Sequence, residues 1–322
     1  MLFISIYMDE SLSKIKQLFD ESRRILIIGH KKPDGDACGS ILALQIYLSG
    51  LGKTIGTFVS DEPPVYFNFL PYFEEIKADP NVFSESWDLI VFVDSGDIVH
   101  TGVDLNAIAG IPTVNIDHHF SNAGYGYANL VVPCASSTCE IIYRLLRDLG
   151  ADIDRRIANC LLTGILSDTG GFSNAATSLE AMAVASDLTK RGGKIYQIFN
   201  HSVKNKSLNG LKLWGQVFSR IRINRQYNIA YTYITADDFS RFGVSEEELD
   251  GIANFLNVIT DVNFSLVLHL DKSETKVSLR TTRDDIDLSR LAGYFGGGGH
   301  KKAAGFTVPW IISEKEGNLS IN

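Results

Sequence analysis

Short apolar runs separated by polar loops and helix-like stretches dominate the first 200 residues of the chain. Residues 25–28 and 89–93 are continuous runs of Ile, Leu, Val and Phe, and 112–117 is a more mixed run. Such runs predict strands buried on both faces. Helical periodicity predicts helices over 41–48, 137–149, 154–165 and 178–191. Strands that alternate with helices predict an α/β fold with a mostly parallel sheet and helical crossovers.

The pattern changes in the last third of the chain. Residues 228–235, 262–270 and 275–281 alternate between apolar and polar, which predicts half-buried strands. Helical patterns over 245–258 and 287–295 lie between and after them. We therefore expect a second, smaller α/β domain with a mixed sheet. The expected organisation is a catalytic domain over 1–200, a helical connector over 201–215 and a substrate-binding domain over 216–322.

Polar side chains with metal-binding chemistry follow the buried strands of the first domain. Because the carboxyl ends of neighbouring parallel strands meet at one edge of a sheet, residues placed directly after them are expected to lie together. Three strand ends and one helix-like run supply six such residues: His30, Asp34, Asp36, Asp94, His118 and Asp168. Two imidazoles and four carboxylates are too many for one ordinary ion and suit a pair of divalent cations. The oxygen-rich set favours Mn²⁺, with Mg²⁺ or Co²⁺ as alternatives.

The loop that carries the first three of these residues also contains turn-forming residues. Pro33 and Gly35 flank Asp34, and we expect the following helix to open at Gly39 or Ser40. Asp34 and Asp36 are therefore expected in a loop before the helix.

The composition indicates which partners the protein is suited to bind and in which cellular compartment it is expected. The 322 residues carry 30 basic and 38 acidic side chains, a net charge of −8, which disfavours a broad electrostatic footprint for long nucleic acid. The four cysteines form no CxxC pair, so reduced thiols are expected. No apolar stretch reaches the roughly 18–20 residues that span a bilayer. A cytoplasmic protein is the expectation.

At the six metal-binding residues, the sequence resembles the DHH phosphoesterase family. The family's His-x-x-x-Asp-x-Asp motif matches 30–36, its second motif matches Asp94, its Asp-His-His motif matches 117–119, and its fourth motif matches Asp168. The glycine run 296–299, followed by His300, matches the substrate-binding motif of the C-terminal domain associated with this family. Motifs from two domains occur in the family's order, so the resemblance covers nearly the whole chain.

The resemblance implies a role for each motif residue. It makes the six residues above the ligands of two divalent ions, with Asp94 as the bridging carboxylate and with the site in the cleft between the domains. His119 and Asp117 are then catalytic. His119 faces the substrate phosphate or the leaving oxygen, and Asp117, which is not itself a ligand, supports a ligating imidazole by fixing its tautomer and raising its basicity. The implied substrate-binding residues are Arg280, Gly297, Gly298, Gly299 and His300.

Within the family, the chain resembles stand-alone enzymes that cleave short oligoribonucleotides to mononucleotides and convert 3′-phosphoadenosine 5′-phosphate (pAp) to AMP. One alternative is a phosphodiesterase of linear or cyclic dinucleotides such as pApA or cyclic di-AMP. Another is a catalytically silent nucleotide-binding protein. The expected partners are short oligonucleotides or nucleotide phosphates, without long duplex nucleic acid or membrane, and a homodimer stays an open possibility.

Overall fold

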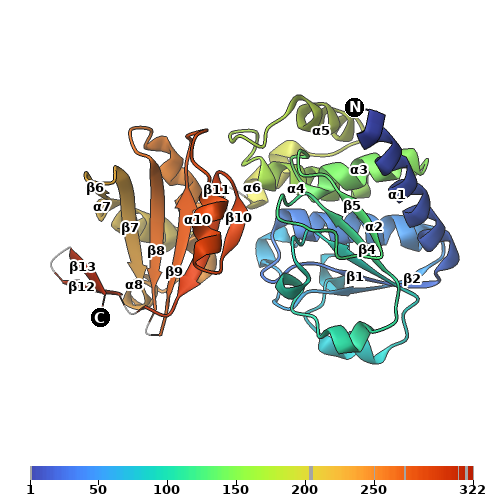
Figure 1. Ribbon diagram of the computed structural model, residues 1–322, viewed down its shortest axis with the longest axis horizontal. Coiled ribbons are helices and arrows are strands. Elements are labelled where there is room, and N and C mark those ends of the chain that lie inside the picture. Colours follow the sequence, from blue (N-terminus) through green and yellow to red (C-terminus); the bar gives the residue numbers. More distant parts are fainter. Residues whose placement is uncertain are drawn as a thin grey trace. The chain divides into compact units, whose positions relative to one another are not determined.

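The protein is described by a computed structural model that covers residues 2–202, 206–249, 251–271, 273–310, 312–315 and 318–321. The chain divides into two compact units, Met1–Asn205 and Lys206–Asn322 (Figure 1). The expected connector over 201–215 contains residues 203–205, which lie outside the described residues. Its second half contains the start of a helix of the second unit, α7 (Leu208–Ser219).

The first unit is built on a five-stranded sheet in which all neighbouring strands run parallel. The strand order is β2-β1-β3-β4-β5. The strands are β1 (Arg24–Ile28), β2 (Thr54–Phe58), β3 (Leu89–Val93), β4 (Thr113–Asp117) and β5 (Ala128–Val131). The predicted mostly parallel sheet is confirmed, and β1, β3 and β4 lie next to one another with their carboxyl ends at the same edge.

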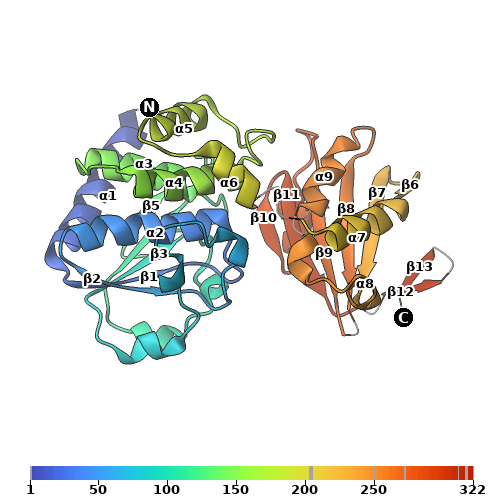
Figure 2. The same cartoon turned by 180° about the vertical axis from the view of Figure 1, so that it is seen from behind.

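The α-helices of the first unit gather on one face of this sheet (Figures 1 and 2). They are α1 (Leu2–Glu21), α2 (Gly35–Gly50), α3 (Thr138–Asp148), α4 (Arg155–Asp168), α5 (Leu179–Lys190) and α6 (Ile195–Ser202). In β1, Ile25 and Ile27 pack into the core beneath these helices, whereas Leu26 and Ile28 pack into a smaller core on the other face. The period-2 alternation of a strand thus divides one apolar run between two cores.

Short 3₁₀ helices, rather than α-helical crossovers, border the smaller core. They include the segments Pro80–Ser84, Ile98–Thr101 and Leu105–Ile108. Apolar side chains from these segments, such as Val82, Phe83 and Ile98, pack against the strand residues. The prediction of helical crossovers is therefore right for the face of the sheet that α2 covers, while short 3₁₀ helices cover the other face.

The second unit contains a six-stranded mixed sheet in the order β10-β11-β9-β8-β7-β6. Only the β7–β8 pair is parallel. The strands are β6 (Arg222–Asn224), β7 (Ile229–Thr235), β8 (Phe264–Leu270), β9 (Thr275–Arg280), β10 (Gly298–His300) and β11 (Ala303–Val308). A separate hairpin pairs β12 (Ile312–Lys315) with β13 (Asn318–Ile321). The predicted mixed sheet is confirmed.

Helices on the second unit pack against this sheet through two apolar clusters. Besides α7, they are α8 (Ala236–Phe242), α9 (Ile252–Phe255) and α10 (Leu288–Tyr294). Leu213 and Val217 of α7 pack with Ile234 of β7 in one cluster, and Leu288 and Ala292 of α10 lie in the other. The sheet is therefore covered on both faces.

One predicted helix of the second unit is wrong. The pattern over 245–258 predicts a single helix, but the described residues of this range form 3₁₀ turns at Glu246–Leu249 and Leu256–Val258 and one short α-helix, α9. Gly251 precedes α9 with φ of +93°, a left-handed conformation that ends any helix passing through it.

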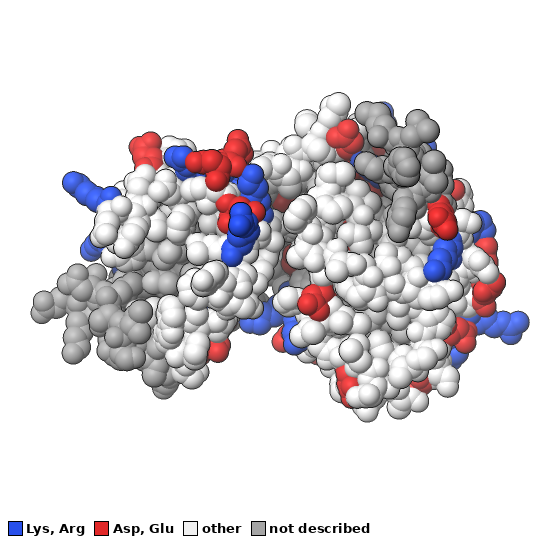
Figure 3. All heavy atoms as spheres, in the orientation of Figure 1, with Lys and Arg blue, Asp and Glu red and all other residues white. Residues whose placement is uncertain are grey.

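Two further features of the structure concern the distribution of charged side chains and the apolar character of the helices. On the face shown in Figure 3, acidic and basic side chains of the described residues are interspersed. Among the described residues, no helix combines the length and the apolar character needed to cross a membrane.

Candidate metal centre

The loop after β1 leads directly into α2, and here the sequence-based expectation is wrong in one detail. The helix begins at Gly35, not at Gly39 or Ser40. Asp34 is its N-cap, and the Asp34 side chain accepts hydrogen bonds from the backbone N–H groups of Asp36 and Ala37 at 2.8 and 3.1 Å. Because this cap satisfies amides that would otherwise lack partners, the helix starts four residues early. Asp36 therefore lies in the first turn of α2 rather than in a loop.

Asp36 is held by a second helix that is distant in sequence. Its side chain is fully buried and accepts hydrogen bonds from the backbone N–H groups of Thr138 (2.6 Å) and Cys139 (2.9 Å) at the N-terminus of α3. Anionic groups are favourable at helix N-termini because unpaired amides and the helix dipole both favour negative charge. These two bonds fix the orientation of the carboxylate.

Asp94 follows β3 and lies at the centre of the cluster. Its φ of +54° is left-handed, a conformation uncommon for residues other than glycine, and its side chain is 3% exposed. Oδ2 lies 3.4 Å from Nε2 of His30, whereas Oδ1 lies 3.6 Å from Nε2 of His118. The two oxygens of one carboxylate thus face two different histidines.

The six sequence-predicted ligands fall into two groups around Asp94. In each group the potential ligand atoms lie within 4.8 Å of one another: His30, Asp34 and Asp94 form one group, and Asp36, His118 and Asp168 form the other. Asp168, at the last turn of α4, lies 3.1 Å from His118 through Oδ2 and Nε2. The structure therefore brings together all six side chains that the sequence singled out.

The chemistry of this donor set fits two divalent cations. Four carboxylates supply four negative charges, which two divalent ions would balance. Burial and the nearby carboxylates of Asp94 and Asp168 raise the pKa of Asp36 well above its ordinary value of 3.8, and burial raises the pKa of Asp168 to about 6. These two buried carboxyl groups resist ionisation, and bound cations would stabilise their charged forms.

His119 and Asp117 form a separate pair beside this cluster. Nδ1 of His119 lies 2.8 Å from Oδ1 of Asp117, and Oδ2 of the same carboxylate accepts a hydrogen bond from Asn122 at 2.7 Å. Both oxygens of Asp117 therefore have partners, and its carboxylate orients the ring of His119. Burial lowers the pKa of His119, but the hydrogen bond to Asp117 and the charge of Asp94 outweigh this effect and raise the pKa above 6.5.

Two residues that support the cluster were missed by the sequence analysis. Thr138 donates its hydroxyl to Oδ1 of Asp94 at 3.1 Å, besides its backbone bond to Asp36. Asn122 orients Asp117. One signal could have pointed to Thr138: Ser137, with Glu140 three residues on, is an N-cap pattern, and a helix N-terminus near a metal loop can bind a carboxylate.

The sequence-predicted substrate residues lie in the second unit. Arg280, at the end of β9, donates through Nε to Oδ1 of Asn254 at 2.6 Å and through a guanidinium N–H to the carbonyl of Leu279 at 2.8 Å. Gly298, Gly299 and His300 form the edge strand β10. Gly297 packs so closely on the backbone of Gly305 that a side chain there would clash, so this glycine has a packing role whether or not it binds substrate. The assignment of these residues to substrate binding stays a prediction.

Replacing Thr138 by valine is expected to weaken Mn²⁺ binding about 10- to 100-fold, the usual effect of removing a group that orients a metal ligand. Valine keeps the branched shape and the backbone N–H, but it removes the hydroxyl that donates to Asp94. Titration calorimetry with Mn²⁺ would measure the change. Thr138→Ser is the control, because serine retains the hydroxyl. If the serine variant loses as much affinity as the valine variant, the hydroxyl is not the group that matters.

Metal binding is expected to release protons and to stabilise the protein more at pH 8 than at pH 6. Burial lowers the pKa of His118, but the hydrogen bond and charge of Asp168 raise it well above 6.5, and Asp168 itself has a pKa of about 6. Both groups hold more protons in the folded, metal-free protein than in the unfolded chain. Their contribution to stability is fully present below the unfolded pKa values and is lost as the pH rises through the folded ones.

Cations bind the deprotonated forms and so remove this pH dependence. The rise in melting temperature on adding Mn²⁺ should therefore grow between pH 6 and pH 8. Calorimetry in two buffers with different ionisation enthalpies should detect about one to two protons released per protein. A binding enthalpy independent of the buffer would contradict this expectation.

Comparison with known proteins gives consistent matches over both units. Residues 24–165 match the model of the DHH family, N-terminal domain, and residues 226–318 match that of the DHHA1 domain. The chain is 31% identical over 288 residues to the bifunctional oligoribonuclease and PAP phosphatase NrnA of Thermus thermophilus, covering 88% of this chain and 84% of the relative.

The chain is also similar to two proteins whose names refer to activities other than that of the NrnA protein. A probable manganese-dependent inorganic pyrophosphatase of Streptococcus mutans is 30% identical over 177 residues, which cover 53% of this chain and 56% of that protein. The crystal structure of an exopolyphosphatase-related protein from Bacteroides fragilis superposes with a TM-score of 0.86 and 28% identity, covering 92% of this chain and 91% of the other. The similarity to the NrnA protein and to the crystal structure extends over both units, whereas that to the pyrophosphatase covers about half of the chain.

Proposed function

Because the chain belongs to the DHH family, we propose that it is a two-metal phosphoesterase that hydrolyses short oligoribonucleotides to mononucleotides and pAp to AMP. The single observation that carries the proposal is the position of Asp94, whose two carboxylate oxygens face two separate groups of ligands. A carboxylate in that position is suited to bridge two cations. The NrnA homologue supports the choice of substrates, since it is similar over most of both chains.

Two divalent ions, when bound, supply an activated water for in-line attack on phosphorus and neutralise charge on the phosphate oxygens. We propose that His30, Asp34 and Asp94 hold one ion and that Asp36, His118, Asp168 and Asp94 hold the other. Mn²⁺ is the proposed ion, because the donor set is rich in oxygen with two imidazoles and because the similar pyrophosphatase is named as manganese-dependent. Mg²⁺ and Co²⁺ are the alternatives.

The chain's own residues position the substrate and move protons. The hydrogen bond between Asp117 and Nδ1 of His119 fixes the ring and favours its protonated form. A protonated imidazole can donate a hydrogen bond to a phosphate oxygen or to the leaving oxygen, whose negative charge grows in the transition state. In the second unit, Arg280 is proposed to bind phosphate, with its guanidinium oriented by Asn254. Gly297, Gly298, Gly299 and His300 are proposed to contact the rest of the nucleotide.

A chromatographic time course with Mn²⁺ would test the proposal on pAp, a five-residue RNA, pApA and cyclic di-AMP side by side. Conversion of pAp to AMP and of the RNA to mononucleotides would support it. Strong preference for pApA or cyclic di-AMP, with pAp untouched, would assign the protein to dinucleotide turnover. No turnover of any substrate from pH 7 to pH 9 would favour a catalytically silent nucleotide-binding protein.

A further inference from the structure

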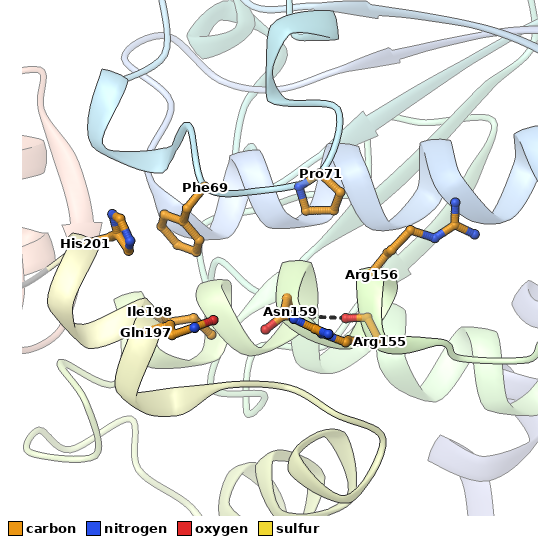
Figure 4. Close-up of a pocket in the computed structure, with 8 residues that line it drawn as sticks. All are labelled: Phe69, Pro71, Arg155, Arg156, Asn159, Gln197, Ile198 and His201. Atoms are coloured by element: carbon orange, nitrogen blue, oxygen red, sulfur yellow. Dashed lines mark hydrogen bonds between the residues drawn. The ribbon is translucent and has the colours of Figure 1, made fainter.

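A groove of about 360 Å³ lies on the first unit, at the opposite end of α4 from Asp168 (Figure 4). It is bounded by the loop at Phe69, by the start of α4 at Arg155 and Arg156, and by α6 at Gln197 and His201. We call this the α4–α6 groove. Its volume lies within the range of about 300–1,000 Å³ that is usual for small-molecule sites.

The α4–α6 groove is separate from the metal cluster. Arg155 is the first residue of α4 and Asp168 the last, 13 residues apart. At about 1.5 Å of rise per residue, the two ends of the helix lie about 20 Å apart. None of the six proposed metal ligands lines the groove. A ligand in the groove therefore does not occupy the metal centre.

An aromatic pair forms one end of the groove. The rings of Phe69 and His201 stack, with centroids 4.8 Å apart and planes inclined by 26°. The two residues come from different elements, and Figure 4 shows their rings beside each other at the same end of the groove. His201 is exposed and Phe69 is half-buried. Stacked rings that remain open to solvent are suited to accept a further flat ring, as in proteins that bind single-stranded nucleic acid.

The polar groups of the groove include a cation without an anionic partner. In the part of the chain that the structure describes, no carboxylate lies within ion-pair distance of Arg155, whereas Arg156 is bound to Asp154 at 2.7 Å. The aliphatic stem of Arg155 runs past Gly192, where a Cβ atom would lie 3.2 Å from its Cγ, so the backbone there constrains the side chain. Arg155 is therefore available to bind an anion.

Gln197 supplies the hydrogen-bonding groups. Its side-chain amide has no hydrogen-bond partner among the described residues and is exposed on α6. The neighbouring amide of Asn159 is already engaged, because it donates to the carbonyl of Arg155 and accepts from the N–H of Lys194. An aromatic surface, one unpaired guanidinium and one open amide match the three parts of a nucleotide: ring, phosphate and polar base edge.

We propose that the α4–α6 groove binds a nucleotide unit, with the base against Phe69 and His201, the phosphate at Arg155 and the base edge at Gln197. The proposal rests on the proposed function, whose substrates and products are nucleotides. The nucleotide has two possible sources, which share this chemistry. It is either a nucleotide of an oligoribonucleotide several residues away from the bond that is cleaved, or a free mononucleotide.

Steady-state kinetics with Mn²⁺ would identify the first source. Arg155→Ala and Gln197→Ala should each raise KM for a five-residue RNA about tenfold, as loss of one base or phosphate contact does, and leave pAp and a dinucleotide unchanged. Arg23→Ala is the matched control. It removes one exposed arginine from the same unit, but beside the first residue of β1, at the opposite edge of the sheet from the metal cluster.

Calorimetry with AMP on the metal-free full-length protein would identify the second source. AMP binding that Arg155→Ala weakens about tenfold, and that Asp94→Asn leaves unchanged, would place a free nucleotide in the groove. The proposal is overturned if neither KM for the RNA nor AMP affinity responds to Arg155 or Gln197. It is also overturned if the two variants raise KM equally for pAp, dinucleotide and RNA. An equal rise would show that the substitutions disturb α4 and, through it, Asp168 in the metal cluster, rather than a contact with RNA in the groove. Failure of the proposed function would instead be seen as absence of turnover by the unmodified protein. The AMP titration does not depend on turnover and would still test whether the α4–α6 groove binds a nucleotide.

Discussion

Replacing Asp94 by alanine is expected to lower turnover of pAp and short RNA by at least about 10³-fold. The carboxylate faces both ligand groups, so its loss weakens the binding of both ions. Bound metal ions contribute several kcal/mol of transition-state stabilisation, and each 1.4 kcal/mol or so corresponds to a tenfold change in rate. Calorimetry or metal analysis after gel filtration should also show fewer than two Mn²⁺ per chain.

Asp97→Ala is the control for this variant. Asp97 lies three residues further along the same loop and caps the 3₁₀ helix Ile98–Thr101 by accepting a hydrogen bond from the N–H of Val99. Its loss should cost about 1 kcal/mol of stability, as is usual for a helix cap, without affecting turnover. Unchanged activity in the Asp94 variant, or equal loss in both variants, would defeat the bridging role.

Replacing Gly164 by alanine is expected to destabilise the protein by about 3 kcal/mol and to abolish Mn²⁺ binding. Gly164 lies in the middle of α4, where a Cβ atom would clash with Sγ of Cys139 and with Oδ1 of Asp36. Both neighbours are fully buried, and Asp36 is fixed by two backbone hydrogen bonds, so neither can move freely. Overpacking of a core typically costs about 1–3 kcal/mol and occasionally more. Urea denaturation and Mn²⁺ titration would measure the two effects.

Gly215→Ala makes the same change in a helix where there is room. Gly215 is exposed on α7, and apart from its chain neighbours and the adjacent backbone of the helix, no atom lies within 4 Å of the place its Cβ would take. Alanine should there stabilise the protein by up to about 1 kcal/mol, because it favours the helical backbone. If Gly164→Ala keeps its stability and its Mn²⁺ binding as Gly215→Ala is expected to do, then α4 does not pack as closely against the metal cluster as the structure indicates.

Much of the fold and the candidate ligand set could be predicted from the sequence. Continuous apolar runs identify β1 and β3, and carboxylates placed directly after such runs are few enough to single out Asp94. The resemblance to the DHH family is confirmed by the matches to both domain models and by the NrnA homologue. The roles of individual residues stay predictions.

The details that the sequence did not provide depend on contacts between distant segments. Thr138 is 44 residues from Asp94, and its hydroxyl contacts that carboxylate only because α3 meets the edge of the sheet there. The early start of α2 was missed because Asp34 was interpreted as a metal ligand in a loop. An aspartate that caps a helix and one that binds a metal cannot be distinguished in the sequence. β10 has only three residues, too few to show a period, and β11 begins with Ala-Ala-Gly, which does not alternate between apolar and polar. Gly251 was read as part of a helix because its positive φ cannot be seen in the sequence.

Anomalous diffraction from crystals grown with Mn²⁺ would show whether this cluster holds two cations, one on either side of Asp94. We expect two anomalous peaks about 3.5–4 Å apart, the usual spacing of such pairs, with one oxygen of Asp94 near each. His30 should lie beside one peak and His118 beside the other. A single peak, or two peaks of which neither contacts Asp94, would contradict the account.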